Sequence, residues 1–164
     1  MATVDRFPEY PRRIAPKMQP GTTYVRQAGY YAIRDLDPKV SAPKAMFTLD
    51  EGSTAIYRGD PMASRFPQAS GRLGPVYSVG EGGTLAVPTG LIFIRFKDGI
   101  RAEDRRQQVE HAGYRFVEVP HYAPSAAWVR SDDIAQSLHG LAALEALPDV
   151  ESVEPQMLMR STRR

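Results

Sequence analysis

The segment Leu141–Met157, with the sequence LAALEALPDVESVEPQM, constrains the fold most because it contains a helix end, a stop and a strand in succession. Pro148 has a fixed φ and no N–H to donate, so a helix that reaches this point must end near Leu147. Upstream, Ser131 or Asp132 is a suitable N-cap. The sequence therefore predicts a helix over 132–147. Apolar residues at helical spacing along it form its buried stripe: Ile134, Leu138, Leu141, Ala142 and Leu147.

A strand is predicted directly after this stop. Val150 and Val153 begin an extended segment that Pro155 limits. A proline there fits an edge strand or a strand end, because it cannot donate to a central ladder. The residues from Leu158 to Arg164 are then expected to project as a free tail.

Composition excludes several classes of protein. The chain has 164 residues, of which 42% are hydrophobic, so it is long enough to bury one good core. A net charge of +2 is too small to indicate nucleic-acid binding. The absence of cysteine excludes disulfides, thiolate catalysis and cysteine-based metal sites. No segment has the length and apolar character of a signal peptide or membrane span, so a cytoplasmic location is the simplest interpretation.

The first half of the chain divides into two predicted regions. Residues 1–44 are rich in Pro and Arg and lack a sustained period, which favours an arm that is mobile or packed on another surface. Tyr30, Tyr31 and Ile33 are suited to a short anchoring strand within it. Residues 45–88 read as short strands between turns, one of them the run TAIYR at 54–58, with residues 76–79 expected to pair with 85–87 across a Gly-rich turn. Residues 59–75 are predicted to be a loop.

The second half, residues 89–164, has a regular plan. Alternating apolar runs predict strands over 91–96, 114–119 and 126–130, and a polar helix is predicted over 101–112, closed by Gly113. With the helix and strand described above, the order is strand, helix, strand, strand, helix, strand. This order predicts an α+β fold: a ferredoxin-like βαββαβ antiparallel sheet with both helices on one face, preceded by the hairpin-rich extension.

Residues 89 to 157 resemble the propeptide-like inhibitor domain of subtilisin-type serine proteases. The resemblance rests on IFIRFKDGI, AGYRFVEVP, AAWVRS and above all LEALPDVESVEPQ. It implies a non-catalytic inhibitor or folding chaperone whose strands lie against two surface helices of the protease. Its tail would then occupy the substrate cleft like a bound product. Because no protease domain follows Arg164, the resemblance implies action in trans on a subtilisin-like serine protease.

The resemblance also assigns candidate binding residues at the end of the chain. Alignment of VESVEPQ with the family puts Met159 about four residues before the would-be scissile position and Thr162 at it. The basic tail departs from the family and suits an acidic cleft or a protease that prefers basic residues. The predicted protease-binding tail comprises Met157, Leu158, Met159, Arg160, Ser161, Thr162, Arg163 and Arg164.

A possible secondary interface lies in the loop between the two middle strands. In the family, carboxylates in this region can cap the positive amino ends of protease helices. Here the loop offers His121 and Tyr122 but no acid, and Glu118 is nearby. Tyr122 and Trp128 belong to residue types that dominate protein interfaces, although a tryptophan on a strand is more often a core residue.

Catalytic patterns are absent. The three histidines, His111, His121 and His139, lack the spacing of a metal site, and neither Ser125 nor Ser131 has a G-x-S-x-G setting. We therefore expect no enzymatic activity, no cofactor and no metal, and neither a membrane nor a small molecule as partner. The alternative is a structural, assembly or RNA-binding module that uses the open sheet face. RNA binding is not favoured, because Ile92, Ile94, Tyr114 and Phe116 do not reproduce the aromatic signature of RNA-reading sheets.

Overall fold

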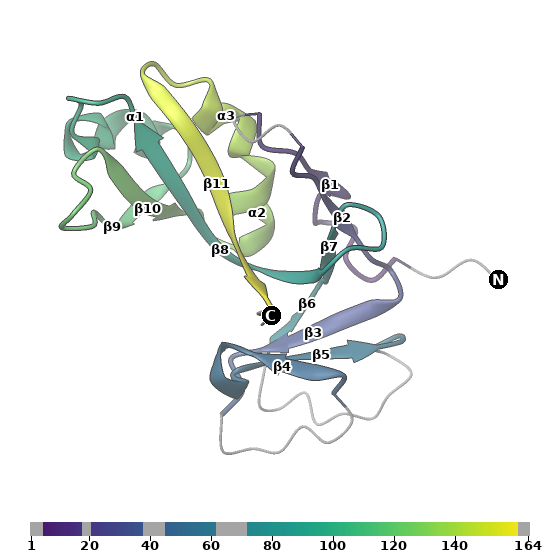
Figure 1. The fold of residues 1–164 in the computed structure, drawn as a ribbon. Helices are drawn as coiled ribbons and strands as arrows, with labels where there is room; N and C mark the ends of the chain where they lie inside the picture. The colour runs from purple at the N-terminus through teal and green to yellow at the C-terminus, as the bar shows by residue number, and fades with distance from the viewer. Residues whose placement is uncertain (1–4, 18–20, 38–44, 62–71, 161–164) are drawn as a thin grey trace. The chain divides into compact units, whose positions relative to one another are not determined.

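The computed structural model describes residues 5–17, 21–37, 45–61 and 72–160 (Figure 1). The chain divides into two compact units. Unit 1 comprises residues 1–8, 24–87 and 157–164, and unit 2 comprises residues 9–23 and 88–156. Each unit is assembled from separated segments, so these bounds differ from the contiguous divisions expected from the sequence. The backbone passes between the units at four places, after Pro8, Thr23, Val87 and Gln156.

The predicted fold class is wrong. Of the described residues, 40% lie in strands and 18% in helices, so the chain is mostly β and does not have a ferredoxin-like α+β fold. These residues form eleven strands but only three α-helices, each of five or six residues. The error arose before residue 88, where segments interpreted as an arm or a loop form strands that pair with distant partners. Amino-acid composition and the local spacing of apolar residues do not indicate which distant strands pair with one another.

A four-stranded sheet in unit 1 has the order β4-β5-β3-β6. Its neighbouring strands are all antiparallel. The prediction of a strand over TAIYR is confirmed, and Tyr57 in it stacks on Tyr31 with ring centroids 5.1 Å apart. By contrast, β6 lies inside the predicted loop. The strands are β3 (Tyr30–Arg34), β4 (Phe47–Leu49), β5 (Thr54–Arg58) and β6 (Arg72–Gly74), with a 3-10 turn η1 (Asp50–Gly52) between β4 and β5.

A hairpin in unit 1 joins β7 (Tyr77–Val79) to the first part of β8 (Leu85–Phe96). Tyr77 lies opposite Ala86 and Ser78 opposite Leu85. The turn is closed by a 2.9 Å hydrogen bond from the Val79 N–H to the Thr84 carbonyl. The predicted hairpin is therefore confirmed. On its other side β7 pairs with β2 (Tyr24–Arg26).

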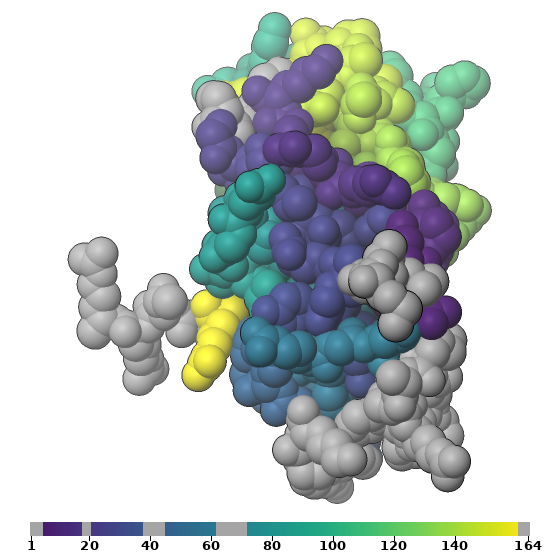
Figure 2. Space-filling view, turned by 90° about the vertical axis from the view of Figure 1, so that its right-hand side faces the viewer, coloured from purple at the N-terminus to yellow at the C-terminus, as the bar shows by residue number. Residues whose placement is uncertain are grey.

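The hydrophobic core of unit 1 includes the end of the chain's last strand, β11 (Val150–Met159). The partly buried Leu158 packs against a cluster formed by Ala32, Leu49, Ile56, Val76 and Val87. Figure 2 shows this yellow end of β11 against the blue strands that include β4. Leu158 and Met159 therefore belong to β11 and are not part of a free tail, contrary to the prediction from the sequence. Apolar side chains at this end of the strand bind it to the core.

Four strands of unit 2 lie side by side in the order β9-β10-β8-β11 (Figure 1). β9 (Arg115–Glu118) pairs antiparallel with β10 (Ala126–Arg130), which pairs antiparallel with the second part of β8. β8 and β10 are thus the central strands. Pro155 lies within β11, which pairs with β8 at the margin of this group, and a proline is tolerated there. The short strand β1 (Arg13–Ile14) also belongs to this unit.

The helices of unit 2 are shorter than predicted. The first begins as a 3-10 turn, η3 (Ala102–Arg105), and continues as α1 (Arg106–His111), with Ala102 and Val109 fully buried. The second is divided at Gly140 into α2 (Ile134–His139) and α3 (Leu141–Glu145). Asp133 caps α2, since its carboxylate accepts a 2.8 Å hydrogen bond from the Gln136 N–H.

Three of the leucines around α2 and α3 are buried. Leu138 and Leu141 are 4% and 7% exposed, as predicted, and Leu144 is fully buried. The predictions of a buried Ala142 and a buried Leu147 are wrong, since Ala142 is exposed and Leu147, which follows the end of α3, is half-buried. The division of the helix at Gly140 changes which positions face the core.

Candidate protein-binding surface

One face of the unit 2 sheet covers the core and the other reaches solvent. Along β8, Ile92 and Ile94 are fully buried, whereas Phe93 between them is half-buried and Arg95 is exposed. Since successive side chains of a strand point to opposite faces, Phe93 and Arg95 share the outer face. Trp128 and Arg130 of β10 lie on it too, because Trp128 is directly opposite Phe93.

An aromatic pair forms the centre of this outer face. The rings of Phe93 and Trp128 lie 4.8 Å apart with an interplanar angle of 57°, on the two central strands of the unit. The Arg95 guanidinium lies over the Phe93 ring, 5.6 Å from its centroid. We call this surface the outer sheet face and define it by seven residues: Leu91, Phe93, Arg95, Arg115, Glu118, Trp128 and Arg130.

The edge strand β9 carries a bulge beside this face. Glu118 pairs with Trp128 and Phe116 pairs with Val129, so Val117 is an extra residue between two paired ones. Val117 is 51% exposed. In the following loop His121 is exposed, and Tyr122, at 87%, has one of the most exposed large side chains described. The predicted secondary-interface residues Glu118, His121 and Tyr122 thus all reach solvent at one end of the β9–β10 pair.

Charges of both signs surround the aromatic pair. Arg130 lies opposite Arg115, which forms an ion pair of 3.6 Å with the exposed Asp132. The carboxylate-bearing Glu118 lies opposite Trp128. The Nε of Arg130 is buried and has no hydrogen-bond partner among the described residues. The face therefore combines an apolar centre with a mixed polar margin, an arrangement typical of protein interfaces.

The residues predicted to form a protease-binding tail have different surroundings. Met157 and Leu158 are half-buried in β11, and Met159, its last residue, is 42% exposed. The Arg160 guanidinium lies over the Phe47 ring of unit 1 at 5.2 Å. The remaining predicted tail residues, Ser161, Thr162, Arg163 and Arg164, lie outside the described residues.

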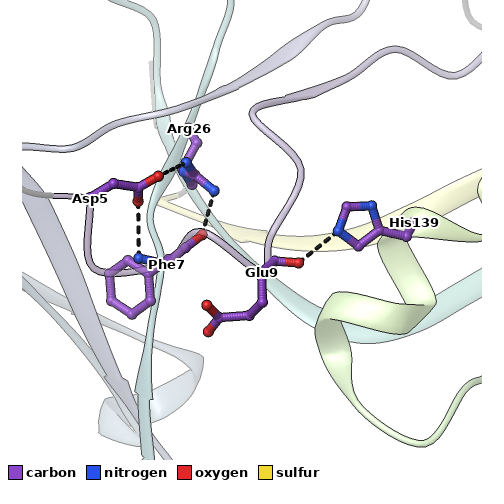
Figure 3. Close-up of polar contacts among 5 residues, drawn as sticks. All are labelled: Asp5, Phe7, Glu9, Arg26 and His139. Atoms are coloured by element: carbon purple, nitrogen blue, oxygen red, sulfur yellow. Dashed lines mark hydrogen bonds and ion pairs between the residues drawn. The ribbon is translucent and has the colours of Figure 1, made fainter.

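A second polar cluster, in unit 1, centres on Arg26 (Figure 3). The Arg26 side chain is only 8% exposed, and its Nη2 lies 2.6 Å from Asp5 Oδ2. Arg26 also donates to the Phe7 carbonyl, while Asp5 Oδ1 accepts a 3.0 Å hydrogen bond from the Phe7 N–H. A cavity beside the cluster has a volume of about 10 Å³, about enough for one water molecule. These contacts hold residues 5–7 in place. The cavity beside them is too small for an organic ligand.

The histidines show no catalytic grouping in the described part of the chain. His139 Nε2 lies 2.6 Å from the backbone carbonyl of Glu9, a contact within unit 2 that Figure 3 also shows. No group of three or more His, Asp or Glu side chains among the described residues is arranged to hold a metal ion. The Ser131 N–H donates a 2.9 Å hydrogen bond to Ser137 Oγ, and the Ser131 hydroxyl donates a 2.9 Å hydrogen bond to the Gly113 carbonyl, so Ser131 is a structural residue.

Sequence reasoning missed Phe93 and Arg95, and it left Trp128 between an interface role by residue type and the core position more usual for a tryptophan on a strand. The signal was present in LIFIRF, where Phe93 and Arg95 alternate with the buried Ile92 and Ile94. Because the second central strand was taken to be the segment from Tyr114, Phe93 was never matched with its true neighbour Trp128. Strand order, which a single sequence does not report, was the missing information.

Comparison of this chain with protein-family models, curated proteins and solved structures finds no match. No helix among the described residues is long and apolar enough to cross a membrane.

Proposed function

We propose that this chain is a non-catalytic protein-binding module that acts in trans as an inhibitor or folding chaperone of a subtilisin-like serine protease. The single observation that carries the proposal is the outer sheet face, where the Phe93–Trp128 pair lies partly open to solvent on the two central strands. Aromatic and arginine side chains supply most of the binding energy in protein interfaces. This face supplies both.

The choice of partner rests on the family resemblance of residues 89–157. In that family the inhibitor domain sets its strands against protease helices, and the outer sheet face is the surface of unit 2 suited to such a contact. Tyr122 and His121, exposed at the end of the β9–β10 pair, extend the surface beyond the strands. A rigid sheet also loses little conformational entropy on binding.

The position of β11 limits how the tail takes part. A product-like tail that began at Met157 would have to withdraw Leu158 from the core of unit 1. Burial of a leucine side chain is worth about 1.5–3 kcal/mol when complete, so withdrawal opposes binding. We therefore assign docking to the outer sheet face, and a contribution in the substrate cleft to residues from Met159 onward.

Inhibition assays test this function. The full chain is titrated against a panel of active-site-titrated subtilisin-type proteases, and the inhibition constant is measured for the wild type, Trp128→Ala and a control. We expect Trp128→Ala to raise the inhibition constant about 30-fold or more, as for an interface hot spot. Met46→Ala is the control, because Met46 is 46% exposed but belongs to unit 1.

Two results would contradict the proposal. A wild-type chain that inhibits no protease of the panel and assists the refolding of none removes the proposed partner. Inhibition that is equally strong in Trp128→Ala, with circular dichroism confirming the fold of both proteins, removes the outer sheet face as the docking surface.

One observation favours RNA as a second candidate partner. The aromatic side chains Phe93 and Trp128 lie on both central strands of a four-stranded arrangement, where RNA-reading sheets stack bases. The expectation against RNA binding was based in part on Ile92 and Ile94. These two side chains belong to the buried face of the sheet and not to the outer sheet face. The carboxylate of Glu118, opposite Trp128, disfavours a polyanion at this surface.

A further inference from the structure

Arg95 differs from most arginines whose contacts the structure describes. Six arginines form ion pairs with carboxylates: Arg6, Arg26, Arg72, Arg105, Arg106 and Arg115. Among the described residues Arg95 has no such partner, although it is exposed beside the aromatic pair of the candidate surface. Its described contact is with the Phe93 ring, at 5.6 Å.

This contact prepares the guanidinium for binding. A guanidinium held over an aromatic ring by a cation–π contact is partly immobilised before a partner arrives, so less rotamer entropy remains to be lost. A contact with the ring engages none of the guanidinium N–H donors with an acceptor oxygen, so they are available for a bidentate acceptor. The planar carboxylate of Asp or Glu matches that fork.

We propose that the partner of the outer sheet face presents a carboxylate to Arg95, next to an apolar group that covers Phe93 and Trp128. This inference rests on the proposed function and specifies the protease surface that the chain recognises. In the related family, carboxylates of the inhibitor domain face positive helix ends of the protease. Here the cation is on the inhibitor side, so the matching protease surface is acidic. Arg95 is therefore a specificity-determining residue.

The surrounding charges favour a protein over a nucleic acid as the occupant. Glu118 lies directly opposite Trp128, so bases stacked on that ring would bring phosphates near a carboxylate. A folded protein can place an apolar or basic group there and a carboxylate at Arg95, two positions away from Phe93 along β8. Mixed charges of this kind select one register of one partner.

A series of substitutions at Arg95 in the full chain tests the inference. Inhibition constants are measured for wild type, Arg95→Lys, Arg95→Gln and Arg95→Glu against the protease that the wild type inhibits most strongly. We expect the inhibition constant to rise in that order, about 30-fold or more for Arg95→Glu. Arg72→Glu is the matched control, because it makes the same charge change at a side chain that is 77% exposed in unit 1.

Ionic strength gives a second readout that a structural role for Arg95 would not produce. Between about 0.05 M and 0.5 M NaCl, the wild-type inhibition constant should rise steeply, and that of Arg95→Gln should rise less. A further arm adds an oligouridylate of about 12 nucleotides and records the fluorescence of Trp128, the only tryptophan of the chain. We expect no salt-sensitive quenching by the oligonucleotide.

The outcomes separate the two proposals. Inhibition by the wild type that is unchanged in Arg95→Glu overturns the Arg95 inference alone. Oligouridylate that quenches Trp128 at micromolar concentration, with loss of quenching in Arg95→Glu, also overturns it, because the anion recognised would be phosphate. A wild-type chain that neither inhibits any subtilisin-type protease nor assists the refolding of one overturns the proposed function and the inference that rests on it.

Discussion

The ring of Tyr114 occupies the space that a side chain at Gly140 would need. Tyr114 donates its phenolic hydrogen to the Ser137 carbonyl, and a Cβ placed on Gly140 would lie against the phenolic oxygen and the two ring carbons beside it. The buried tyrosine thus fixes the identity of the residue that separates α2 from α3. Two segments remote in the sequence, the residue that precedes the strand β9 and the α2–α3 junction, constrain each other at this point.

Gly140→Ala should therefore destabilise the protein. We expect a loss of about 1–3 kcal/mol in the free energy of unfolding, because Tyr114 is buried and cannot move without losing contacts. Urea denaturation measures it. Gly29→Ala is the control, since nothing lies within 4 Å of its added Cβ, and it should change the value by less than about 0.5 kcal/mol. Equal stability of the two variants would show that the junction tolerates a side chain.

Tyr114 should also make stability depend on alkaline pH. Burial raises the pKa of Tyr114 above the value of about 10 that the residue has in an unfolded chain. Below pH 10 the residue is neutral in both states and its contribution is complete. Above pH 10 the unfolded chain loses the proton while the folded protein retains it, so stability falls as the pH rises.

Urea denaturation between about pH 8 and pH 11 measures this effect. Tyr114→Phe should flatten the decline, at a cost of about 1 kcal/mol at neutral pH for the lost hydrogen bond to Ser137. Tyr122→Phe, at an 87% exposed side chain, should leave the decline unchanged. A wild-type decline that is no steeper than that of Tyr114→Phe would exclude Tyr114 as its source.

Leu144 should matter more to stability than Leu147. Leu144 is fully buried, so Leu144→Ala should cost about 2–5 kcal/mol through lost burial and the cavity that remains. Leu147 is half-buried, and Leu147→Ala should cost distinctly less. Chemical denaturation of both variants measures the difference. A larger loss of stability in Leu147→Ala would indicate that Leu147 packs in the core, as the continuous helix predicted over 132–147 requires.

Leu158 should stabilise unit 1 even though it lies six residues before the last one. Leu158→Ala should lower the free energy of unfolding by about 1–2 kcal/mol, because the side chain packs on the cluster that contains Val87 and Leu49. Met159→Ala, at the neighbouring side chain that is 42% exposed, should have an effect below about 0.5 kcal/mol. Equal, negligible losses would indicate a tail that does not contribute to the core.

Strands with a clear local pattern were predictable from the sequence. The run Ala126–Arg130 was predicted with the bounds it has, as was Thr54–Arg58, since both are short, rich in β-forming side chains and flanked by turn residues. The break at Gly140 was not predicted, because a single glycine costs a helix only about 1 kcal/mol and its neighbours favour a helix. The contact that requires a glycine at this position is made by Tyr114, which is distant in the sequence.

The strand β8 shows the same limit. The strand was predicted to begin at residue 91, after Pro88 and Gly90, yet β8 continues through both. Gly90 has a φ of 91°, and a Cβ there would lie 3.0 Å from Ile134 Cγ1, so glycine allows the strand to approach α2. A prediction from local sequence places a strand end at this glycine, because such a prediction takes no account of the contact with Ile134. For the same reason the outer sheet face appeared only with the strand order.

The four passages of the backbone between the units restrict how this gene can be divided. A fragment that begins at residue 88 lacks residues 9–23 of unit 2 and the first three residues of β8, and a fragment that stops at residue 87 lacks the last stretch of unit 1. No single stop codon or alternative start therefore yields either unit complete. Recombination could transfer an intact unit only by moving several separated coding segments at once, so the two units are inherited as one.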